Sequence, residues 1–413
     1  MPTPTAVPIT VRGTKVTLWH TQSGPNAQLL NKIVLDFNKS QSSYTIAPEY
    51  KGNYNDLYQA NLAAINAGQP VTLSVAYENQ VAAFYSSGLV VAWDEYMNNS
   101  QIGLSAADKA DFFPAFLELG KFPQFGNKFL TFPFAKSLEL MWYDADMVKQ
   151  AGFDKPPATW GDFKTQMLKI NKTVSPAWEF SADASRFATW VFSRGGDLIS
   201  PDGKTLTIDT PEAEEAMALL AEAAKAKAVR APQGYQSETD FEQQKTVFYQ
   251  DSSAARSYIL ADLKKAGKTF NWTAEMPPVG KTGQTPRSDL YGGNVCLFKT
   301  SADAQRGAWA FMKYFSDTKQ TAAWALGTGY VPLRKSATET PAYRQFLAEN
   351  PRNSVAIDGL KYPGNTGEPK VAAWQQVRDI LQSMLQSVMA GTAQPKQALA
   401  EVNQKANNVM KTS

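Results

Sequence analysis

The first 90 residues alternate between strand-like and helix-like segments, and this alternation restricts the fold more than any other feature of the chain. Short apolar runs with strand patterning are separated by longer segments that carry apolar side chains at helical spacing. The strand-like runs cover residues 14–20, 44–50 and 71–76, and the helical segments cover residues 26–38, 55–67 and 80–87. Elements in this order build βαβ units around a parallel sheet, so we predict an α/β fold.

Polar and aromatic side chains stand at the end of each of the three strands. They are Trp19 and His20 at the first strand, Tyr50–Tyr54 after the second, and Tyr77 with Glu78 after the third. In an open α/β sheet, ligands bind in the crevice beyond the carboxyl ends of the strands. We therefore expect binding residues at these strand ends.

A second unit begins near residue 125. Strand patterns at 128–134 and 138–143 precede a helix at 146–151. Two further helix starts follow, because Thr159 and Thr210 stand at N-cap positions. A chain of 413 residues with 43% apolar composition can bury more than one core, so we predict two globular lobes.

Composition excludes several classes of function. The 41 basic and 38 acidic residues are spread along the chain, so nucleic-acid binding is not expected. One cysteine, Cys296, and one histidine, His20, provide no cluster for a metal site. The string Gly280-Lys281-Thr282 lacks the leading glycine of a phosphate-binding loop, because Glu275 occupies that place. We expect no enzyme activity, no metal and no cofactor.

The start of the chain and its hydropathy bear on location. No run of 18 or more apolar residues predicts a membrane span. Residues 1–10 are rich in proline and threonine and are expected to form a flexible tether, or the stub left after a signal segment has been removed. An ordinary cytosolic start is the alternative interpretation.

Several segments resemble the type 1 extracellular solute-binding proteins of ABC importers, the family that includes the maltose binders. The strings Pro157-Ala-Thr-Trp-Gly-Asp-Phe163 and Gly327-Thr-Gly-Tyr-Val-Pro-Leu333 are frequent signatures of that family. Within it, the glycerol-3-phosphate and glycerophosphodiester binders are the most similar branch, chiefly through Tyr50-Lys-Gly-Asn-Tyr54. Further matches lie at Leu18–His20, Val75–Glu78, Phe132–Phe134 with Ser137, Gly292-Gly293 and Gln394–Leu399.

The resemblance implies a two-lobed periplasmic-binding-protein fold of type II, in which each lobe is a sheet flanked by helices and a hinge joins the lobes. On that pattern, residues 11–124 with 287–332 form the N-terminal lobe, and residues 125–286 with 333–413 form the C-terminal lobe. The solute is expected to lie between the lobes, which close around it.

The resemblance also implies ligand-binding roles for Tyr54, Glu78, Ser137, Gly293 and Tyr330. Glu78 is an acceptor-only group, which suits the paired hydroxyls of a glycerol moiety, although a surface acid is the alternative interpretation. The two tyrosines each offer an apolar face and a phenol that can donate to oxygen, although core tyrosines would look the same in the sequence.

The expected phosphate partners depart from the pattern of that branch. Its basic residue, typically an arginine, is matched here by Lys370, which can hold phosphate only as a point charge. Arg256 stands where serines are expected. Its guanidinium either supplies the two-pronged contact to phosphate that Lys370 cannot make, or is a surface charge. Arg186 and Trp190 are the candidates in the segment where the family is rich in tryptophan.

The function implied is that of the extracytoplasmic solute-binding component of an ABC importer. It would bind glycerol-3-phosphate or a glycerophosphodiester by hinge closure, and the alternative ligand is a neutral mono-, di- or oligosaccharide. We expect a monomer that docks onto membrane permease subunits in the periplasm or outside the cell. Lipid anchoring at the outer face of the cytoplasmic membrane is left open.

Overall fold

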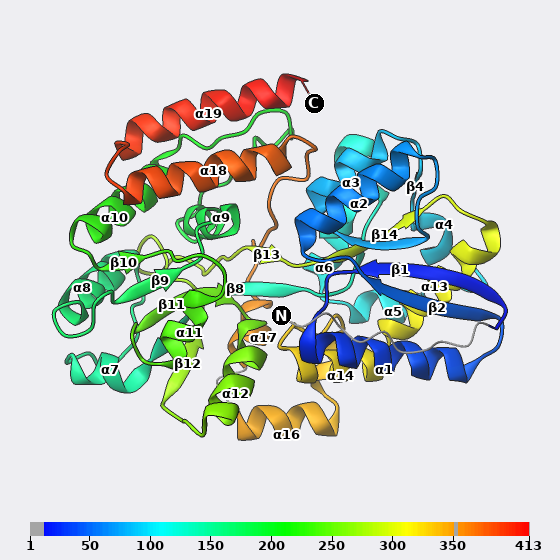
Figure 1. Ribbon diagram of the computed structural model, residues 1–413, viewed down its shortest axis with the longest axis horizontal. Coiled ribbons are helices and arrows are strands. Elements are labelled where there is room, and N and C mark those ends of the chain that lie inside the picture. Colours follow the sequence, from blue (N-terminus) through cyan, green and yellow to red (C-terminus); the bar gives the residue numbers. More distant parts are fainter. Residues whose placement is uncertain (1–11, 351–353, 413) are drawn as a thin grey trace. The chain divides into compact units, whose positions relative to one another are not determined.

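The chain divides into two compact units, each built from separated pieces of sequence. The structure, a computed structural model, describes residues 12–350 and 354–412 (Figure 1). Unit 1 comprises residues up to Lys136, Gly292–Glu349 and Lys370–Ala372, and unit 2 comprises Ser137–Tyr291, Asn350–Pro369 and Ala373–Ser413. The chain therefore first leaves unit 1 after Lys136 and returns to it at Gly292.

The unit boundaries differ in detail from those expected. Residues 125–136, 333–349 and 370–372 belong to unit 1, and residues 287–291 belong to unit 2. The guanidinium of Arg334 gives one physical reason, because it contacts Asp108 Oδ1 at 3.0 Å and so ties the segment after residue 333 to a helix of unit 1. The expected N-terminal tether lies outside the described residues.

Unit 1 is built on a six-stranded sheet. Its strands are β1 (Thr14–His20), β2 (Tyr44–Tyr50), β3 (Leu73–Ala76), β4 (Val90–Val91), β7 (Phe132–Pro133) and β14 (Asn294–Phe298), and β5 (Lys121–Phe122) pairs separately with β6 (Lys128–Phe129). The order is β2-β1-β3-β14-β4, with β7 also paired to β14. β1, β2 and β3 are parallel, as the βαβ pattern predicts, whereas β14 runs antiparallel to its neighbours.

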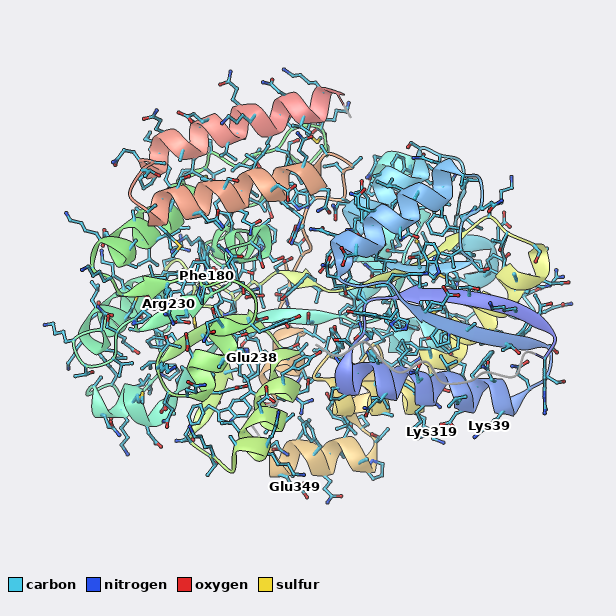
Figure 2. The ribbon with its side chains drawn as sticks, in the orientation of Figure 1. Lys39, Phe180, Arg230, Glu238, Lys319 and Glu349 are labelled. Carbon is cyan, nitrogen blue, oxygen red and sulfur yellow. The ribbon has the colours of Figure 1, made fainter. Side chains whose placement is uncertain are left out.

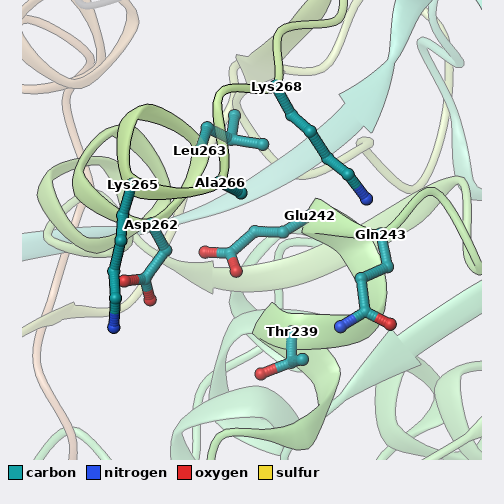
Figure 3. Close-up of a pocket in the computed structure, with 8 residues that line it drawn as sticks. All are labelled: Thr239, Glu242, Gln243, Asp262, Leu263, Lys265, Ala266 and Lys268. Carbon is teal, nitrogen blue, oxygen red and sulfur yellow. The ribbon is translucent and has the colours of Figure 1, made fainter.

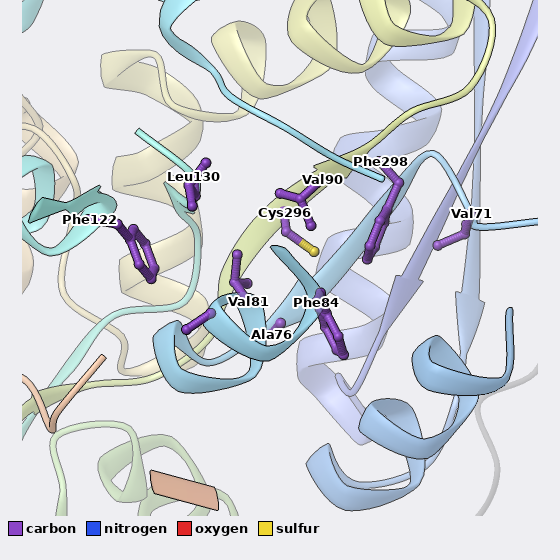
Figure 4. Close-up of a cluster of buried hydrophobic side chains, with 10 residues drawn as sticks. Val71, Ala76, Val81, Phe84, Val90, Phe122, Leu130, Cys296 and Phe298 are labelled. Carbon is purple, nitrogen blue, oxygen red and sulfur yellow. The ribbon is translucent and has the colours of Figure 1, made fainter. Parts of the chain in front are cut away.

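Helices cover both faces of this sheet. They are α1 (Gly24–Ser40), α2 (Tyr54–Asn66), α3 (Glu78–Tyr85), α4 (Asp94–Met97), α5 (Ala106–Asp111), α6 (Pro114–Gly120), α13 (Ala302–Phe315), α14 (Thr318–Thr328), α15 (Lys335–Thr338) and α16 (Pro341–Glu349), with a 3₁₀ turn η1 (Pro123–Phe125). On one face, α13 packs closely against β1. On the other face, Phe84 of α3 packs with Phe298 and Cys296 of β14 (Figure 4). The single cysteine is thus a small buried hydrophobe, as its apolar neighbours predict.

Unit 2 is built on a second six-stranded sheet. Its strands are β8 (Ser137–Asp144), β9 (Trp178–Phe180), β10 (Val229–Arg230), β11 (Phe248–Ser252), β12 (Trp272–Glu275) and β13 (Leu290–Tyr291). The order is β10-β9-β11-β8-β12, with β13 also paired to β8. β9, β10 and β11 are parallel, and β8 runs antiparallel to β11, β12 and β13.

Two helices of unit 2 begin at the N-caps that the sequence predicts, Thr159 and Thr210. The helices of unit 2 are α7 (Ala145–Gln150), α8 (Trp160–Ile170), α9 (Ala184–Phe192), α10 (Pro211–Lys225), α11 (Gln236–Glu242), α12 (Ala255–Ala266), α17 (Ser354–Gly359), α18 (Trp374–Met389) and α19 (Pro395–Thr412). Thr159 and Asp162 form a reciprocal capping box at α8, and Thr210 accepts from Ala213 N–H at α10. Across residues 12–350 and 354–412, no helix combines the length and apolar character needed to cross a bilayer. Each unit is therefore an α/β sheet flanked by helices, which confirms the predicted fold class.

Replacing either of two helical glycines by alanine should change the free energy of unfolding, and the two changes should have opposite signs. A Cβ on Gly307 of α13 would lie 2.6 Å from Tyr44 Cδ1 and 2.8 Å from Val16 Cγ2, whereas a Cβ on Gly161 of α8 would meet Thr159 Oγ1 at 3.6 Å. Alanine is a better helix former than glycine by about 1 kcal/mol. We expect Gly161→Ala to stabilise the protein by about 0.5–1 kcal/mol and Gly307→Ala to destabilise it by about 1–3 kcal/mol through overpacking, measured by urea unfolding. Stabilisation by both changes would contradict the close packing of α13 on β1.

Candidate functional site

Aromatic and acidic side chains gather at the helix starts that follow the strands of unit 1. Tyr54 begins α2, and Tyr77 and Glu78 stand at the start of α3, so each follows a parallel strand. The rings of Tyr54 and Tyr77 stack with centroids 4.2 Å apart and an interplanar angle of 21°. Gly293 lies against this pair, because a Cβ there would be 2.8 Å from Tyr54 Oη. A side chain at residue 293 would therefore displace the Tyr54 phenol.

The phenol of Tyr54 is held by neighbours from three segments. Burial, followed by the nearby Tyr330, raises its pKa, while hydrogen bonds from the Thr21 side chain and the Gly293 backbone act in the opposite direction. Tyr330 itself stacks on Trp324 with ring centroids 5.9 Å apart and an angle of 7°. The structure thus brings Tyr54, Gly293 and Tyr330 together, and it keeps the Tyr54 hydroxyl protonated as a donor.

Glu78 is paired with a buried lysine that sequence analysis missed. Lys136 Nζ lies 3.2 Å from Glu78 Oε1 and donates to Gly292 O at 3.0 Å. The Lys136 side chain is fully buried, whereas Glu78 keeps 12% of its side-chain surface exposed. The available signal was a lysine inside the apolar run Phe132–Leu138, where an unpaired charge would be strongly unfavourable. We call Tyr54, Tyr77, Glu78, Lys136, Gly293 and Tyr330 the unit 1 cluster.

Trp19 and His20 point to opposite faces of β1 because side chains alternate along a strand. Trp19 Nε1 donates to Glu49 Oε2 at 3.0 Å, and Lys51 Nζ lies 4.5 Å from the centre of its ring. His20 is buried, and its Nδ1 accepts from Gln22 N–H at 3.2 Å. Burial lowers the pKa of His20 to about 4. His20 is therefore a neutral acceptor at physiological pH, and Trp19 lies on the α2 side of the sheet.

The Lys370 ammonium is hydrogen-bonded to backbone carbonyls. Its Nζ donates to Glu118 O at 3.0 Å, Leu119 O at 3.1 Å and Lys121 O at 2.8 Å, at the C-terminus of α6. An ammonium has three N–H donors, so these contacts account for all of them. The expected phosphate partner instead caps a helix, where a cation is favoured by the helix dipole.

In unit 2, Arg186 is neutralised by carboxylates. Its Nη1 lies 2.5 Å from Glu139 Oε2, and its Nη2 lies 3.2 Å from Asp251 Oδ2. The Asp251 carboxylate also accepts from Tyr249 Oη at 2.6 Å and keeps 24% of its side-chain surface exposed. Burial would lower the pKa of Arg186, but these carboxylates outweigh it, and the net pKa is raised. Glu139 and Asp251 were not predicted, and no sequence pattern marks them.

The remaining candidates of unit 2 are buried. Trp190 is 1% exposed and donates from Nε1 to Gln250 Oε1 at 2.8 Å, so it belongs to the core. Ser137 begins β8, and its hydroxyl donates to Tyr291 O at 3.4 Å. Arg256 lies in the first turn of α12 and is 6% exposed, so it is not a surface charge.

A separate acidic cluster lies between α11 and α12. Glu238, labelled in Figure 2, lies with Glu242 and Asp262 so that ligand oxygens of the three residues fall within 4.8 Å of one another. Glu242 and Asp262 also line a cavity of about 450 Å³ together with Lys265 and Lys268 (Figure 3). Burial and neighbouring acids raise the pKa of Glu238 to about 9 and that of Glu242 to about 7. Three carboxylates in this arrangement have the oxygen donors that divalent cations prefer.

A family model described as bacterial extracellular solute-binding protein matches residues 32–353, which is more than half of the chain. This protein belongs to the bacterial extracellular solute-binding proteins. Members of the family are transport proteins that bind small polar solutes outside the cytoplasm and deliver them to the permeases of ABC importers. The residues carrying the sequence resemblance therefore identified the family correctly.

Curated relatives and solved structures extend the match to nearly the whole chain. The sn-glycerol-3-phosphate-binding periplasmic protein UgpB of Brucella abortus is 27% identical over 95% of this chain and 92% of its own, and that of Escherichia coli is 24% identical over 96% and 93%. UgpB of Mycobacterium tuberculosis, solved with glycerophosphocholine, matches with a TM-score of 0.84 at 20% identity, over 97% of this chain and 99% of its own. The cyclic alpha-maltosyl-1,6-maltose binding protein of Arthrobacter globiformis matches with a TM-score of 0.81 at 20% identity, over 97% and 100%. These structures are two-lobed solute-binding proteins, which confirms the fold.

The solitary histidine offers a direct test of burial at the end of β1. We expect the His20 ring to titrate near pH 4 in the folded protein and near 6.5 in urea, followed by NMR of its single imidazole signal. Because the unfolded chain binds the proton first, stability should fall as pH drops from about 6.5 towards 4. A folded-state pKa near 6.5 would contradict the buried neutral ring.

Removal of the Lys370 ammonium should destabilise unit 1. Lys370→Met removes the ammonium donor from three carbonyls at the α6 terminus, and we expect a loss of about 2 kcal/mol in urea unfolding. The matched control is Lys121→Met, because the Lys121 side chain is 44% exposed and pairs with Glu118 on the surface. That change should cost less than about 0.5 kcal/mol. Equal effects of the two substitutions would contradict the capping role.

Proposed function

We propose that this solute-binding protein takes up a glycerophosphodiester, with the unit 1 cluster holding its glycerol end. The pairing of Glu78 with Lys136 beside the Tyr54 and Tyr77 rings is the observation that carries the proposal. A carboxylate is acceptor-only, so the exposed part of Glu78 suits two vicinal hydroxyls. The stacked rings offer flat apolar surface to the carbon chain of the ligand.

The charges of the candidate residues favour a phosphodiester over a phosphate monoester. Lys370 is committed to carbonyls, Arg186 to two carboxylates and Lys136 to Glu78. A monoester carries close to two negative charges at pH 7, whereas a phosphodiester carries one. Binding an anion without a matching cation is unfavourable, so the ligand with less charge suits these residues better. A cationic choline group on the phosphodiester would make the ligand a zwitterion and reduce its net charge to zero.

The relatives support the same chemical class. The curated relatives are named for binding sn-glycerol-3-phosphate, and the Mycobacterium tuberculosis relative was solved with glycerophosphocholine. At 24–27% identity, the curated names indicate a class of ligand rather than one compound. Glycerophosphocholine shares the glycerol end with glycerol-3-phosphate and has the lower net charge.

A neutral saccharide is the second candidate. The contacts of Lys370 with carbonyls and of Arg186 with carboxylates favour a saccharide too. A sugar needs acids, amides and flat rings rather than a cation. The Arthrobacter globiformis structure is that of a maltose-derived sugar binder. Its TM-score shows a shared fold and leaves the ligand open between the two classes.

We further propose that the protein acts in the periplasm or outside the cell, binds its solute by closure of two lobes and delivers it as a monomer to the permease of an ABC importer. The family supports delivery to a permease. Closure around the ligand, the monomeric state and lipid anchoring stay predictions.

Isothermal titration tests the ligand class. We expect glycerophosphocholine to bind more tightly than glycerol-3-phosphate, with no heat from maltose or trehalose. Glu78→Gln should weaken glycerophosphocholine at least about tenfold, because a charged acceptor contributes about 1.5–3 kcal/mol. Binding of only the two sugars would replace the glycerophosphodiester by the second candidate.

The matched control is Glu49→Gln. Glu49 also pairs with a lysine in unit 1, because Lys51 Nζ lies 3.0 Å from Glu49 Oε2, but its side chain is 40% exposed. This change should leave the dissociation constant within about twofold. An equal loss of affinity in both variants would show that Glu78 has no special role.

A further inference from the structure

Lys136 occupies an unusual place for a lysine. Its side chain is fully buried, yet its ammonium contacts Glu78 Oε1 at 3.2 Å and the carbonyl of Gly292 at 3.0 Å. A buried ammonium requires acceptors, and a neutral residue of similar length would avoid that requirement. The two acceptors belong to different parts of unit 1, one at the start of α3 and the other just before β14.

The contacts of Lys136 lie where the chain passes between the units. The chain leaves unit 1 after Lys136 and returns at Gly292. The two segments are joined by a hydrogen bond from Ala135 N–H to Gly293 O of 2.9 Å. Gly292 has φ +103°, and a Cβ there would lie 2.1 Å from Ala135 O, so only glycine permits this approach. The Lys136 ammonium adds a side-chain tie between the same two segments.

The backbone of Lys136 also contacts the segment that carries Tyr330. The carbonyl of Lys136 accepts from Val331 N–H at 2.9 Å, directly after Tyr330. The lysine thus connects Glu78 and Gly292 through its side chain and the Tyr330 segment through its main chain. A displacement of this one residue would move groups on three segments that surround Tyr54 and Gly293.

We propose that Lys136 is the positioning residue of the ligand site in unit 1: its ammonium holds the Glu78 carboxylate aimed at the solute, and ties it to Gly292 where the chain returns to this unit. The inference rests on the proposed function, and it makes Lys136 a residue that determines the specificity of the proposed site. A carboxylate held in this way accepts ligand hydroxyls. Its charge is already matched, so it does not select for a cationic ligand.

The experiment measures the affinity for glycerophosphocholine at pH 7, with wild type and Lys136→Met. This probe is suitable because a phosphodiester carries a single negative charge at that pH, whereas a phosphate monoester is a mixture of two charge states. For the variant we expect at least about tenfold weaker binding than for the wild type. A wild-type affinity in the variant would overturn the proposal.

The matched control is Lys51→Met, which removes the lysine of the surface pair with Glu49 and should leave the affinity unchanged. Lys136→Arg is the conservative variant: arginine keeps the charge beside Glu78, so it should recover at least part of the affinity that Lys136→Met loses. If Lys136→Met does not fold, Lys136→Arg is compared with Glu78→Gln instead. A Lys136→Arg variant that binds no more tightly than the variant it is compared with would overturn the role of the charge.

The double variant Glu78→Gln/Lys136→Met separates positioning from a general structural effect. If Lys136 acts through Glu78, the double variant should bind about as weakly as Glu78→Gln alone. Additive losses would overturn the proposal. Absence of glycerophosphodiester binding by the wild type would instead refute the proposed function, so the two failures are distinguishable.

Discussion

Burial of positive charge is the constraint on which much of this structure depends. Moving an ammonium or guanidinium out of water is strongly unfavourable unless acceptors surround it. Lys136 and Arg186 are buried and Lys370 is half-buried, and each is supplied with acceptors from distant parts of the chain. Lys370 contacts a carbonyl 249 residues away, and Lys136 contacts a carboxylate 58 residues away. These contacts join pieces of sequence that local propensity alone would leave independent.

Local periodicity explains what could be predicted of the fold. β1 and β2 have the bounds that the sequence indicates, because alternation is a property of neighbouring residues. The caps at Thr159 and Thr210 were predicted for the same reason. The same rule of alternation predicts that Trp19 and His20 point to opposite faces of the sheet.

The polar contacts of the candidate residues could not be predicted because they depend on tertiary neighbours. Lys370 looked like a phosphate partner in the sequence, but its position beside the end of α6 gives it three carbonyls. Trp190 lies in the core because its indole reaches Gln250 on β11. The role of Lys136 could not be predicted, because a lysine within an apolar run has no local partner. The carboxylate that it contacts belongs to Glu78 on α3.

For the proposed ligand, the pairing of charges in unit 1 is a restriction in its own right. The Lys136 ammonium is already paired with the Glu78 carboxylate, so a solute with two negative charges would leave charge unmatched, and the cost rises steeply in surroundings of low dielectric. A phosphodiester brings one charge, and a zwitterion or a sugar brings none. Selection between these solutes then depends on hydroxyl acceptors and aromatic surface, which Glu78 and the Tyr54–Tyr77 stack supply within unit 1. On our proposal, specificity depends on how the Glu78 carboxylate is aimed, and therefore on the Lys136 ammonium that contacts it.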